Sequence, residues 1–586
     1  MIPGSFPVLL APASGGYVVE GSGLFDGGGY LRRSQVGGSR TTWTVMVLYK
    51  GHSVAGYDYL IDAGNNSPAD NTHYVTAVVR STNRQINYSS ATTGLRLTTQ
   101  TFRDFSGWSQ FVIQYDTTNA TASARHRIWH NGVEITTFDT NNNLGLNHAN
   151  AMNESGQNVT IGNESLSSAT NAKMYMAANA LYDGVVIDGD DVIFGELTND
   201  GFWQINDFSE GDLTGANSHL IIGTDMAAGT DSSGNSNSFT KSGTITATND
   251  SPTDGGDNDE YGDYATLDPL VALGNVIAST TLSNGNLTTT TSSASGHGFN
   301  LSTIPVSGGK YYCEITCVTK TASNMNFGAV DLTSSDLYTD SNSYVGSMQF
   351  SYGYTANATK ISNNATQESY GNAASYGAGD VIGIALDLDN GAIWFSKNDA
   401  WIDGNGTDNS ATVKSEIEAG TTSSSAFATL STTNPMVLTG GTTNNGKATL
   451  NYGATAFAGS APYGFKTINT ANLPVPAVLN PDDHYYSQIV THDGSSTAST
   501  CSFNLDTYEW LAIIKNTTGA VEKWYWIDSI RGVTKYWSST DSSAQTTDSN
   551  VLTVSGTTFT LGSTLGSKNY LVEFHKAGLA SATASN

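Results

Sequence analysis

Hydrophobic and polar positions alternate along most of the chain, and the stretch around residue 390 shows the pattern most clearly. Between 382 and 388 an apolar side chain occupies every second position, which is the period of a β-strand with one face on a core. Asn390 and Gly391 follow, and both tolerate the positive φ of a tight two-residue hairpin turn. The alternation then resumes through Phe395. The pattern therefore predicts a β-hairpin with a large apolar face.

The same alternation recurs towards both ends of the chain. Asn131-Gly132 separates the alternating segments 125–129 and 133–138 and predicts a second hairpin. Further strands and turns are predicted at 41–49, 108–116, 309–315, 509–516, 527–536, 559–562 and 570–574. Many short strands joined by turn residues are typical of sandwiches. The expected fold class is all-β, with tandem β-sandwich or jelly-roll domains.

The composition indicates a folded chain of several domains. At 586 residues the chain is too long for one core. Charged residues make up 13%, against about 25% in typical domains, which at first resembles disorder. Aromatic residues nevertheless make up 10%, and disordered chains lack so many large apolar side chains.

Changes in composition divide the chain into three modules. The predicted modules are 1–250, 264–470 and 481–586, separated by an acidic, Gly-rich linker at 251–263 and a Pro-containing linker at 471–480. The first linker contains Asp254, Asp257, Asp259 and Glu260, which are compatible with a calcium loop or with a solvated linker. The solvated linker is preferred, because the segment lacks the full loop pattern with its terminal bidentate Glu.

Charge and cysteine content narrow the possible partners and compartments. The formal net charge of −27 repels phosphates and anionic membranes, which argues against nucleic acid as a partner and against membrane insertion. The N-terminus has no basic region before a long apolar run, so neither a signal peptide nor an anchor is expected. Cys313 and Cys317 would lie about 13 Å apart along one strand and cannot bridge. Buried thiols and assembly in a reducing cytoplasm are expected.

The central module resembles SPRY (B30.2-type) domains. The resemblance rests on Gly309-Lys310-Tyr311-Tyr312-Cys313-Glu314-Ile315, on the hairpin sequence GDVIGIALDLDNGAIWFSKN beginning at Gly379, and on Asn451-Tyr452-Gly453. SPRY domains are β-sandwich recognition modules without chemistry of their own. The resemblance implies a protein that binds a surface.

The outer modules extend the resemblance to nearly the whole chain. The segments at 29–33, 108–111, 128–134 and 159–162 resemble pieces of the laminin-G/concanavalin-A-like jelly roll, and 231–237 resembles its closing DSSGN segment. Together with the C-terminal β module, this order resembles structural, tail-fibre-like proteins of tailed bacteriophages. The resemblance implies a virion location after assembly in the host cytoplasm, with other virion proteins as partners. A fibre tip, a short spike and a capsid decoration all remain open, because no coiled-coil or collagen-like shaft precedes the modules.

Catalytic constellations are not evident in the sequence. Glu416 and Glu418 would share a strand face about 7 Å apart, but their neighbours indicate a polar loop that would not raise either pKa. His126 and His130 stand outside any metal-binding spacing. We therefore expect no enzyme, no metal and no cofactor.

Aromatic residues of the central module are the candidate ligand-binding residues. Sugars are held by flat aromatic faces and by amide or carboxylate groups that bond their hydroxyls. The candidates lie in Tyr- and Asn-rich sequence and just after the hairpin, and they are Tyr352, Tyr354, Tyr370, Tyr376 and Trp401. The alternative is that these rings pack in the core or at a subunit contact.

The preferred function is a tail fibre or spike component that recognises a host-surface polysaccharide without catalysis. The alternatives are a purely architectural capsid decoration or adaptor, and an enzyme that degrades polysaccharide. A homo-oligomer is expected, with a trimer favoured, because β-sandwich modules expose edges that assembly can bury. Trp524, Tyr525 and Trp526 are expected at subunit contacts, since three consecutive aromatics on a strand cannot all face one core.

Overall fold

The computed structural model describes residues 17–576, apart from 54–55, 65–74, 81–82, 91–93, 166–171, 198–202, 275–279, 293–295, 322–324, 338–342, 363–366, 422–424, 431–433, 475–483, 520–521 and 540–544. The chain forms two compact units, Met1–Leu197 with Trp203–Pro474, and Thr198–Phe202 with Val475–Asn586. Both units are built from β-sheets, which confirms the predicted fold class. Among the described residues no helix is long and apolar enough to cross a membrane.

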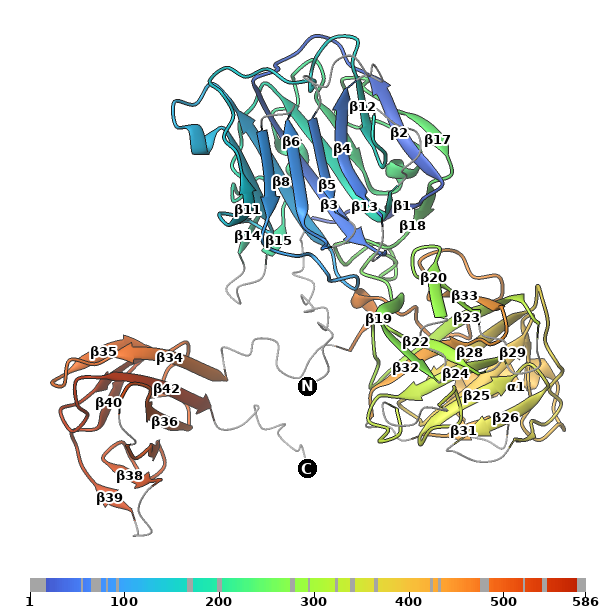
Figure 1. The fold of residues 1–586 in the computed structure, drawn as a ribbon. Coiled ribbons are helices and arrows are strands. Elements are labelled where there is room, and N and C mark those ends of the chain that lie inside the picture. Colours follow the sequence, from blue (N-terminus) through green and yellow to red (C-terminus); the bar gives the residue numbers. More distant parts are fainter. Residues whose placement is uncertain are drawn as a thin grey trace. The chain divides into compact units, whose positions relative to one another are not determined.

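The first sandwich of the first unit packs two eight-stranded sheets over one apolar core (Figure 1). One sheet has the order β10 (Val133–Glu134), β9 (His126–His130), β8 (Ser109–Asp116), β3 (Thr42–Gly51), β13 (Lys173–Asp183), β1 (Ser22–Asp26) and β18 (Thr246–Thr248), with β16 (His219–Ile222) also paired to β13. The other has the order β11 (Phe138–Asn141), β7 (Gly94–Thr98), β6 (Ile86–Ser90), β5 (Val75–Val79), β4 (Asp58–Gly64), β12 (Asn158–Ile161), β2 (Gly29–Ser34) and β17 (Thr240–Gly243). A hairpin of β14 (Gly195–Leu197) and β15 (Trp203–Ile205) and the short 3-10 turns η1 (Ala122–Ala124), η2 (Phe208–Glu210) and η3 (Gly223–Ala227) complete it.

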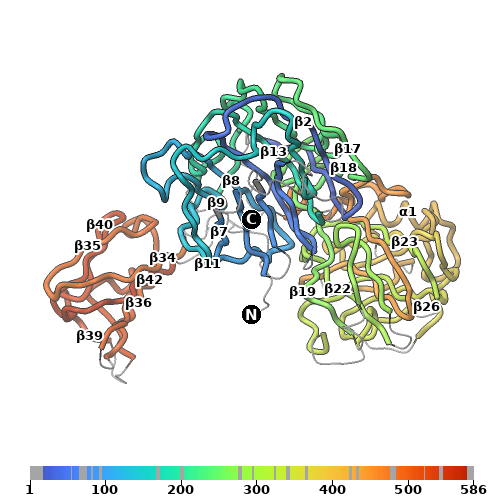
Figure 2. Tube along the Cα trace, turned by 45° about the horizontal axis from the view of Figure 1, so that its top comes forward, coloured from blue at the N-terminus to red at the C-terminus, as the bar shows by residue number. Residues whose placement is uncertain are grey.

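Strands from the start and the end of the first sandwich pair with each other. Strand β18 pairs with β1, and β17 pairs with β2, so that β2, β17 and β18 lie at one edge of the sandwich in both views (Figures 1 and 2). The predicted hairpin at Asn131-Gly132 is confirmed. His130 pairs with Val133, and the two turn residues have φ of 47° and 72°.

The second sandwich lies in the same unit and also contains two main sheets. The larger has the order β20 (Thr280–Ser283), β21 (Thr288–Thr291), β33 (Gly446–Asn451), β23 (Lys310–Thr319), β28 (Val381–Asp387), β29 (Ala392–Lys397) and β30 (Ala400–Trp401), with β31 (Ala428–Thr429) also paired to β29. The smaller has the order β27 (Glu368–Ser369), β26 (Thr359–Ser362), β25 (Ser351–Thr355), β24 (Asn326–Asp331) and β32 (Met436–Gly441). Strands β19 (Leu267–Gly274) and β22 (Gly298–Ser302) form a separate pair, and η5 (Thr470–Asn472) ends the module.

The β28–β29 hairpin forms as predicted, but its turn is longer than two residues. Asp387 pairs with Ala392, which leaves four residues in the loop, and of the Asn-Gly pair only Gly391 has a positive φ, of 67°. Leu388 leaves the ladder because its side chain is buried and its N–H donates to the Gly309 carbonyl. The Asp387 carboxylate then accepts from the Asn390 backbone N–H and closes the turn.

The segment containing Glu416 and Glu418 is a helix, α1 (Ser410–Ala419), so the predicted polar loop was wrong. Asn409 caps its N-terminus by accepting from the Thr412 N–H, and Gly420 ends it in the left-handed conformation. Val413 and Ile417, one turn apart, are buried against the second sandwich, and this tertiary packing stabilises a short helix of polar composition.

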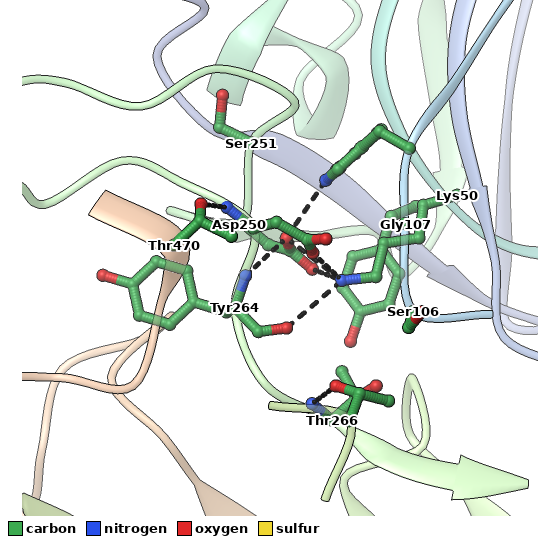
Figure 3. Close-up of polar contacts among 12 residues, drawn as sticks. Lys50, Ser106, Gly107, Asp250, Ser251, Tyr264, Thr266 and Thr470 are labelled. Carbon is green, nitrogen blue, oxygen red and sulfur yellow. Dashed lines mark hydrogen bonds and ion pairs between the residues drawn. The ribbon is translucent and has the colours of Figure 1, made fainter. Parts of the chain in front are cut away.

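A buried ion cluster connects the first two sandwiches (Figure 3). The Lys50 ammonium lies 3.0 Å from Asp250 and 2.5 Å from Asp263, and it also donates to the Tyr264 carbonyl at 3.2 Å. The Asp263 backbone N–H donates to the Thr470 hydroxyl. Segment 251–263, predicted to be a solvated linker, is therefore held at both ends by buried groups. The other predicted linker, 471–480, lies largely outside the described residues.

The second unit is a smaller sandwich. Its six-stranded sheet has the order β34 (Tyr485–Thr491), β42 (Asn569–Lys576), β36 (Trp510–Asn516), β37 (Tyr525–Asp528), β38 (Lys535–Ser538) and β39 (Thr546–Thr547). A three-stranded sheet of β35 (Thr497–Thr500), β41 (Thr558–Leu561) and β40 (Leu552–Ser555) covers one of its faces, and a core of 18 buried residues fills the space between them.

Candidate functional site on the C-terminal sheet

The five rings predicted to bind a ligand are buried: the four tyrosines lie in the core of the second sandwich, and Trp401 lies in the cluster that packs helix α1 against it. Tyr352, Tyr354, Tyr370, Tyr376 and Trp401 are all 3% exposed or less. Tyr354 packs edge-on against Tyr370 and Tyr376, and the Tyr376 hydroxyl donates to the Met325 and Tyr354 carbonyls. These rings cannot present their faces to a ligand, and the core alternative describes them correctly.

The cysteines and the two histidines singled out in the sequence are buried or partly buried. All three cysteines are buried and free, as predicted. Burial lowers the pKa of His126 to about 3 and that of His130 to about 4, so both rings are neutral at physiological pH. In the part of the chain that the structure covers, no group of three or more His, Cys, Asp or Glu side chains is placed to hold a metal ion.

The exposed tryptophans of the described chain all lie in the C-terminal module instead. Tyr525 points into the core and is 7% exposed, whereas Trp524 and Trp526 on either side are 36% and 42% exposed. The alternation expected for three consecutive aromatics is therefore present. Tyr525 packs within its own module, and the expected subunit contact of this segment stays a prediction.

Strand register assembles one continuous row on the outer face of this sheet. Glu573 on β42 pairs with Ile513 on β36, Ile513 pairs with Trp526 on β37, and Trp526 pairs with Trp537 on β38. Trp537 is 46% exposed. We call this outer surface the tryptophan face, and it consists of Ile513, Lys515, Trp524, Trp526, Trp537 and Glu573.

Cations hold two of the three tryptophans of this face. The Lys515 ammonium lies 4.4 Å from the centroid of the Trp524 ring, and the Arg531 guanidinium carbon lies 3.1 Å from that of Trp537. Arg531 is itself oriented by Asp528, to which its Nε donates at 2.6 Å. Among the described residues, neither a cation nor a second aromatic ring is stacked on Trp526.

A shallow depression of about 510 Å³ adjoins the tryptophan face. It is lined by the apolar residues Trp510, Leu511 and Ile530 and by side chains of both charges. The polar lining residues are Glu509, Asp528, Arg531, His575 and Lys576. An apolar surface edged by hydrogen-bonding groups can bind an amphipathic ligand such as a sugar.

This site was only partly accessible from the sequence. Strand periodicity predicted that at least one ring of Trp524, Tyr525 and Trp526 would leave the core. Trp537 lies more than ten residues away and joins this face only because β37 pairs with β38. The register of that pairing cannot be predicted from the local sequence.

Comparison with known proteins identifies part of the second sandwich. Residues 310–411 match the family model of the SPRY domain, which agrees with the resemblance of the hairpin sequence. No curated protein matches the chain. The second sandwich therefore carries a SPRY domain, a class of β-sandwich module, while the match covers too little of the chain to assign the whole protein to a family.

Among solved structures the likenesses concern single modules and the fold alone. The SPRY domain of human HERC1 is 17% identical, with 31% of this chain and 96% of that chain covered, at a TM-score of 0.22. A heptameric SAP-like pentraxin from Limulus polyphemus is 14% identical, with 30% and 81% covered, at 0.22. A Bacteroides ovatus protein provisionally assigned to carbohydrate binding is 12% identical, with 39% and 60% covered, at 0.27. Likenesses at such low TM-scores carry no argument about function.

Proposed function

We propose that the protein recognises a glycan on a bacterial surface without catalysis, as a tail fibre or spike component of a tailed-bacteriophage virion. The observation that carries the recognition function is the tryptophan face, because it gathers three exposed tryptophans into one apolar patch, and such patches mark interaction sites. The order of jelly roll, SPRY domain and small β module supports the virion assignment by resemblance.

The proposed partners are other virion proteins and the host-surface polysaccharide, and the proposed assembly is a homo-oligomer, with a trimer favoured. One shallow sugar site binds weakly. Several tethered copies can raise the overall affinity by about 10²- to 10⁴-fold without any new contact. Repeated weak sites would therefore suffice for adsorption to a cell.

An architectural role, as a capsid decoration or adaptor without a ligand, is the second candidate. Burial of all five candidate rings in the second sandwich favours it, because that module then offers none of them to a sugar. The two roles predict different positions on the particle. A recognition protein lies distally on a tail, whereas a decoration lies on the capsid, and antibody labelling of intact virions in the electron microscope separates them.

Binding of the purified full-length protein to bacterial cells and to their extracted envelope polysaccharide tests the recognition function. The proposal predicts saturable binding with no release of oligosaccharide. Oligosaccharide release would instead favour a polysaccharide-degrading enzyme, and failure to bind any cell or envelope polysaccharide would favour the architectural role.

A further inference from the structure

The open ring of Trp526 sits at the centre of the tryptophan face. Ile513 pairs with it on one side and Trp537 on the other, so its surroundings on the sheet are apolar. It is 42% exposed. A pyranose ring has an apolar C–H face of comparable size, and stacking that face on an indole removes apolar surface of both partners from water.

The flanking tryptophans are fixed before any ligand arrives. Lys515 lies against Trp524, and Arg531, anchored by Asp528, lies against Trp537. Rings that are already ordered lose little conformational entropy when a ligand binds. Trp524, two residues before Trp526, and Trp537, its partner across the strand pair, are thus ordered neighbours of an open ring.

A hydrogen-bond acceptor and a hydrogen-bond donor lie on the same sheet face as the Trp526 ring. Glu573 pairs directly with Ile513 and offers a carboxylate acceptor, whereas Lys515, two residues from Ile513 on the same face, offers an ammonium donor. Among the described residues Lys515 makes no ion pair with a carboxylate. Sugar hydroxyls both donate and accept, so they match this mixed set better than a purely apolar ligand would.

The negative charge of the chain favours neutral glycans over acidic ones. The chain carries a net charge of −27, and the Arg531 cation on this face is already paired with Asp528. A polyanionic chain would approach against this field, with one Lys515 ammonium to compensate for it on the face. A neutral glycan meets no such repulsion.

We propose that the tryptophan face binds a neutral glycan, with one pyranose ring stacked on Trp526 and its hydroxyls bonded by Lys515 and Glu573. This inference rests on the proposed recognition function and adds to it the site and the class of sugar. It places the recognition surface on the C-terminal module rather than on the SPRY domain.

The test is affinity electrophoresis of the full-length protein in native gels. The gels contain either neutral polysaccharides (dextran, mannan, galactan and mixed-linkage β-glucan) or acidic ones (polygalacturonate and hyaluronate). We expect retardation by at least one neutral polysaccharide, with little change between 50 mM and 300 mM salt. Trp526→Ala should weaken binding at least tenfold, because the stacking platform is lost, and K515Q and E573Q should each weaken it severalfold.

Tyr463→Ala is the matched control. Tyr463 is the most exposed aromatic of the first unit at 83%, and its removal tests whether the loss of any exposed ring has the same effect. Circular dichroism and melting confirm that each variant is folded. Light scattering of Trp526→Ala shows whether the tryptophan face instead joins two copies of the chain.

Each result supports or overturns the inference. Equal binding by wild type and folded Trp526→Ala overturns the site, while glycan recognition stands. Retardation only by acidic polysaccharides, which weakens as the salt concentration rises, overturns the inference that the ligand is a neutral glycan. A change of oligomeric state in Trp526→Ala overturns the site in favour of a subunit contact. Wild-type protein that is retarded by none of these polysaccharides overturns this inference, while the binding test on cells and envelope polysaccharide decides the recognition function separately.

Discussion

At the scale of single residues, the buried cluster of Lys50, Asp250 and Asp263 links the stability of the first unit to protonation. One buried ammonium faces two carboxylates, so the cluster would carry an excess negative charge if both acids were ionised. Burial raises the pKa of Asp263 to about 8, and repulsion by Asp250 adds to this effect against the attraction of Lys50. The raised pKa favours the protonated form of Asp263 at neutral pH, although its carboxyl group lies closer to the Lys50 ammonium than that of Asp250 does.

Substitutions at the two aspartates should differ. Asp250→Asn leaves the Lys50 ammonium without its ionised partner and should lower the free energy of unfolding of the first unit by about 3 kcal/mol. Asp263→Asn replaces a neutral acid by a neutral amide and should cost about 1 kcal/mol or less. Chemical denaturation followed by circular dichroism measures both, and equal losses would contradict the assigned protonation.

The same group predicts a dependence of stability on pH. The pKa of Asp263 is higher in the folded chain than the value near 4 of an unfolded Asp, so the folded state binds more protons between these values. Stability from this group is therefore lost as pH rises towards and through 8. The melting temperature of the first unit should fall between about pH 7.5 and 8.5, and Asp263→Asn should remove most of that slope.

This pH window isolates Asp263 from the other strongly shifted groups. Burial raises the pKa of Asp62 and of Asp254 to about 6, so their contributions end below the window. Burial also lowers the pKa of several histidines below the usual 6.5, so the stability that they contribute rises with pH through 6.5 and is nearly fully present from about pH 7.5, where the window begins. These are His126, His130 and His219.

Residue environments show where sequence reasoning succeeds and where it fails. The alternation of Trp524, Tyr525 and Trp526 followed from strand geometry alone. The burial of Tyr352 and Tyr376 did not, because a Tyr in Asn-rich sequence can line either a surface or a core. Which of these occurs depends on strands from distant parts of the chain that cover the ring.

At the scale of elements, strands and hairpins were predictable because period-two alternation and turn residues are local signals. Helix α1 was missed because only Val413 and Ile417 carry its apolar face, and two positions give too weak a periodicity. The extra residues in the β28–β29 turn were missed because Leu388 is drawn into the core by a partner strand.

The Asn131-Gly132 hairpin allows a controlled test of turn geometry. A Cβ on Gly132, where φ is +72°, would lie 2.1 Å from the Trp203 ring, whereas one on Gly156, where φ is +81°, meets nothing within 4 Å. Gly156→Ala should therefore cost about 1 kcal/mol from backbone strain alone. Gly132→Ala should cost about 2 kcal/mol more from the clash, as measured by denaturation, and equal costs would contradict the placement of Trp203.

At the scale of the whole molecule, the two compact units have separate cores, so unfolding should occur in two steps. Calorimetry of the full chain should resolve two transitions, and Asp250→Asn should lower only the one that belongs to the first unit. A single transition that shifts as a whole in this variant would contradict the division.

The central claim is that the protein binds a glycan through the outer face of its C-terminal sheet. The most direct measurement is equilibrium binding of the full-length protein to immobilised bacterial envelope polysaccharides, with wild type and Trp526→Ala compared side by side. The account predicts saturable binding by wild type to at least one neutral polysaccharide, and at least tenfold weaker binding by the folded variant. Binding of equal strength by both proteins, or no binding by the wild type, would contradict it.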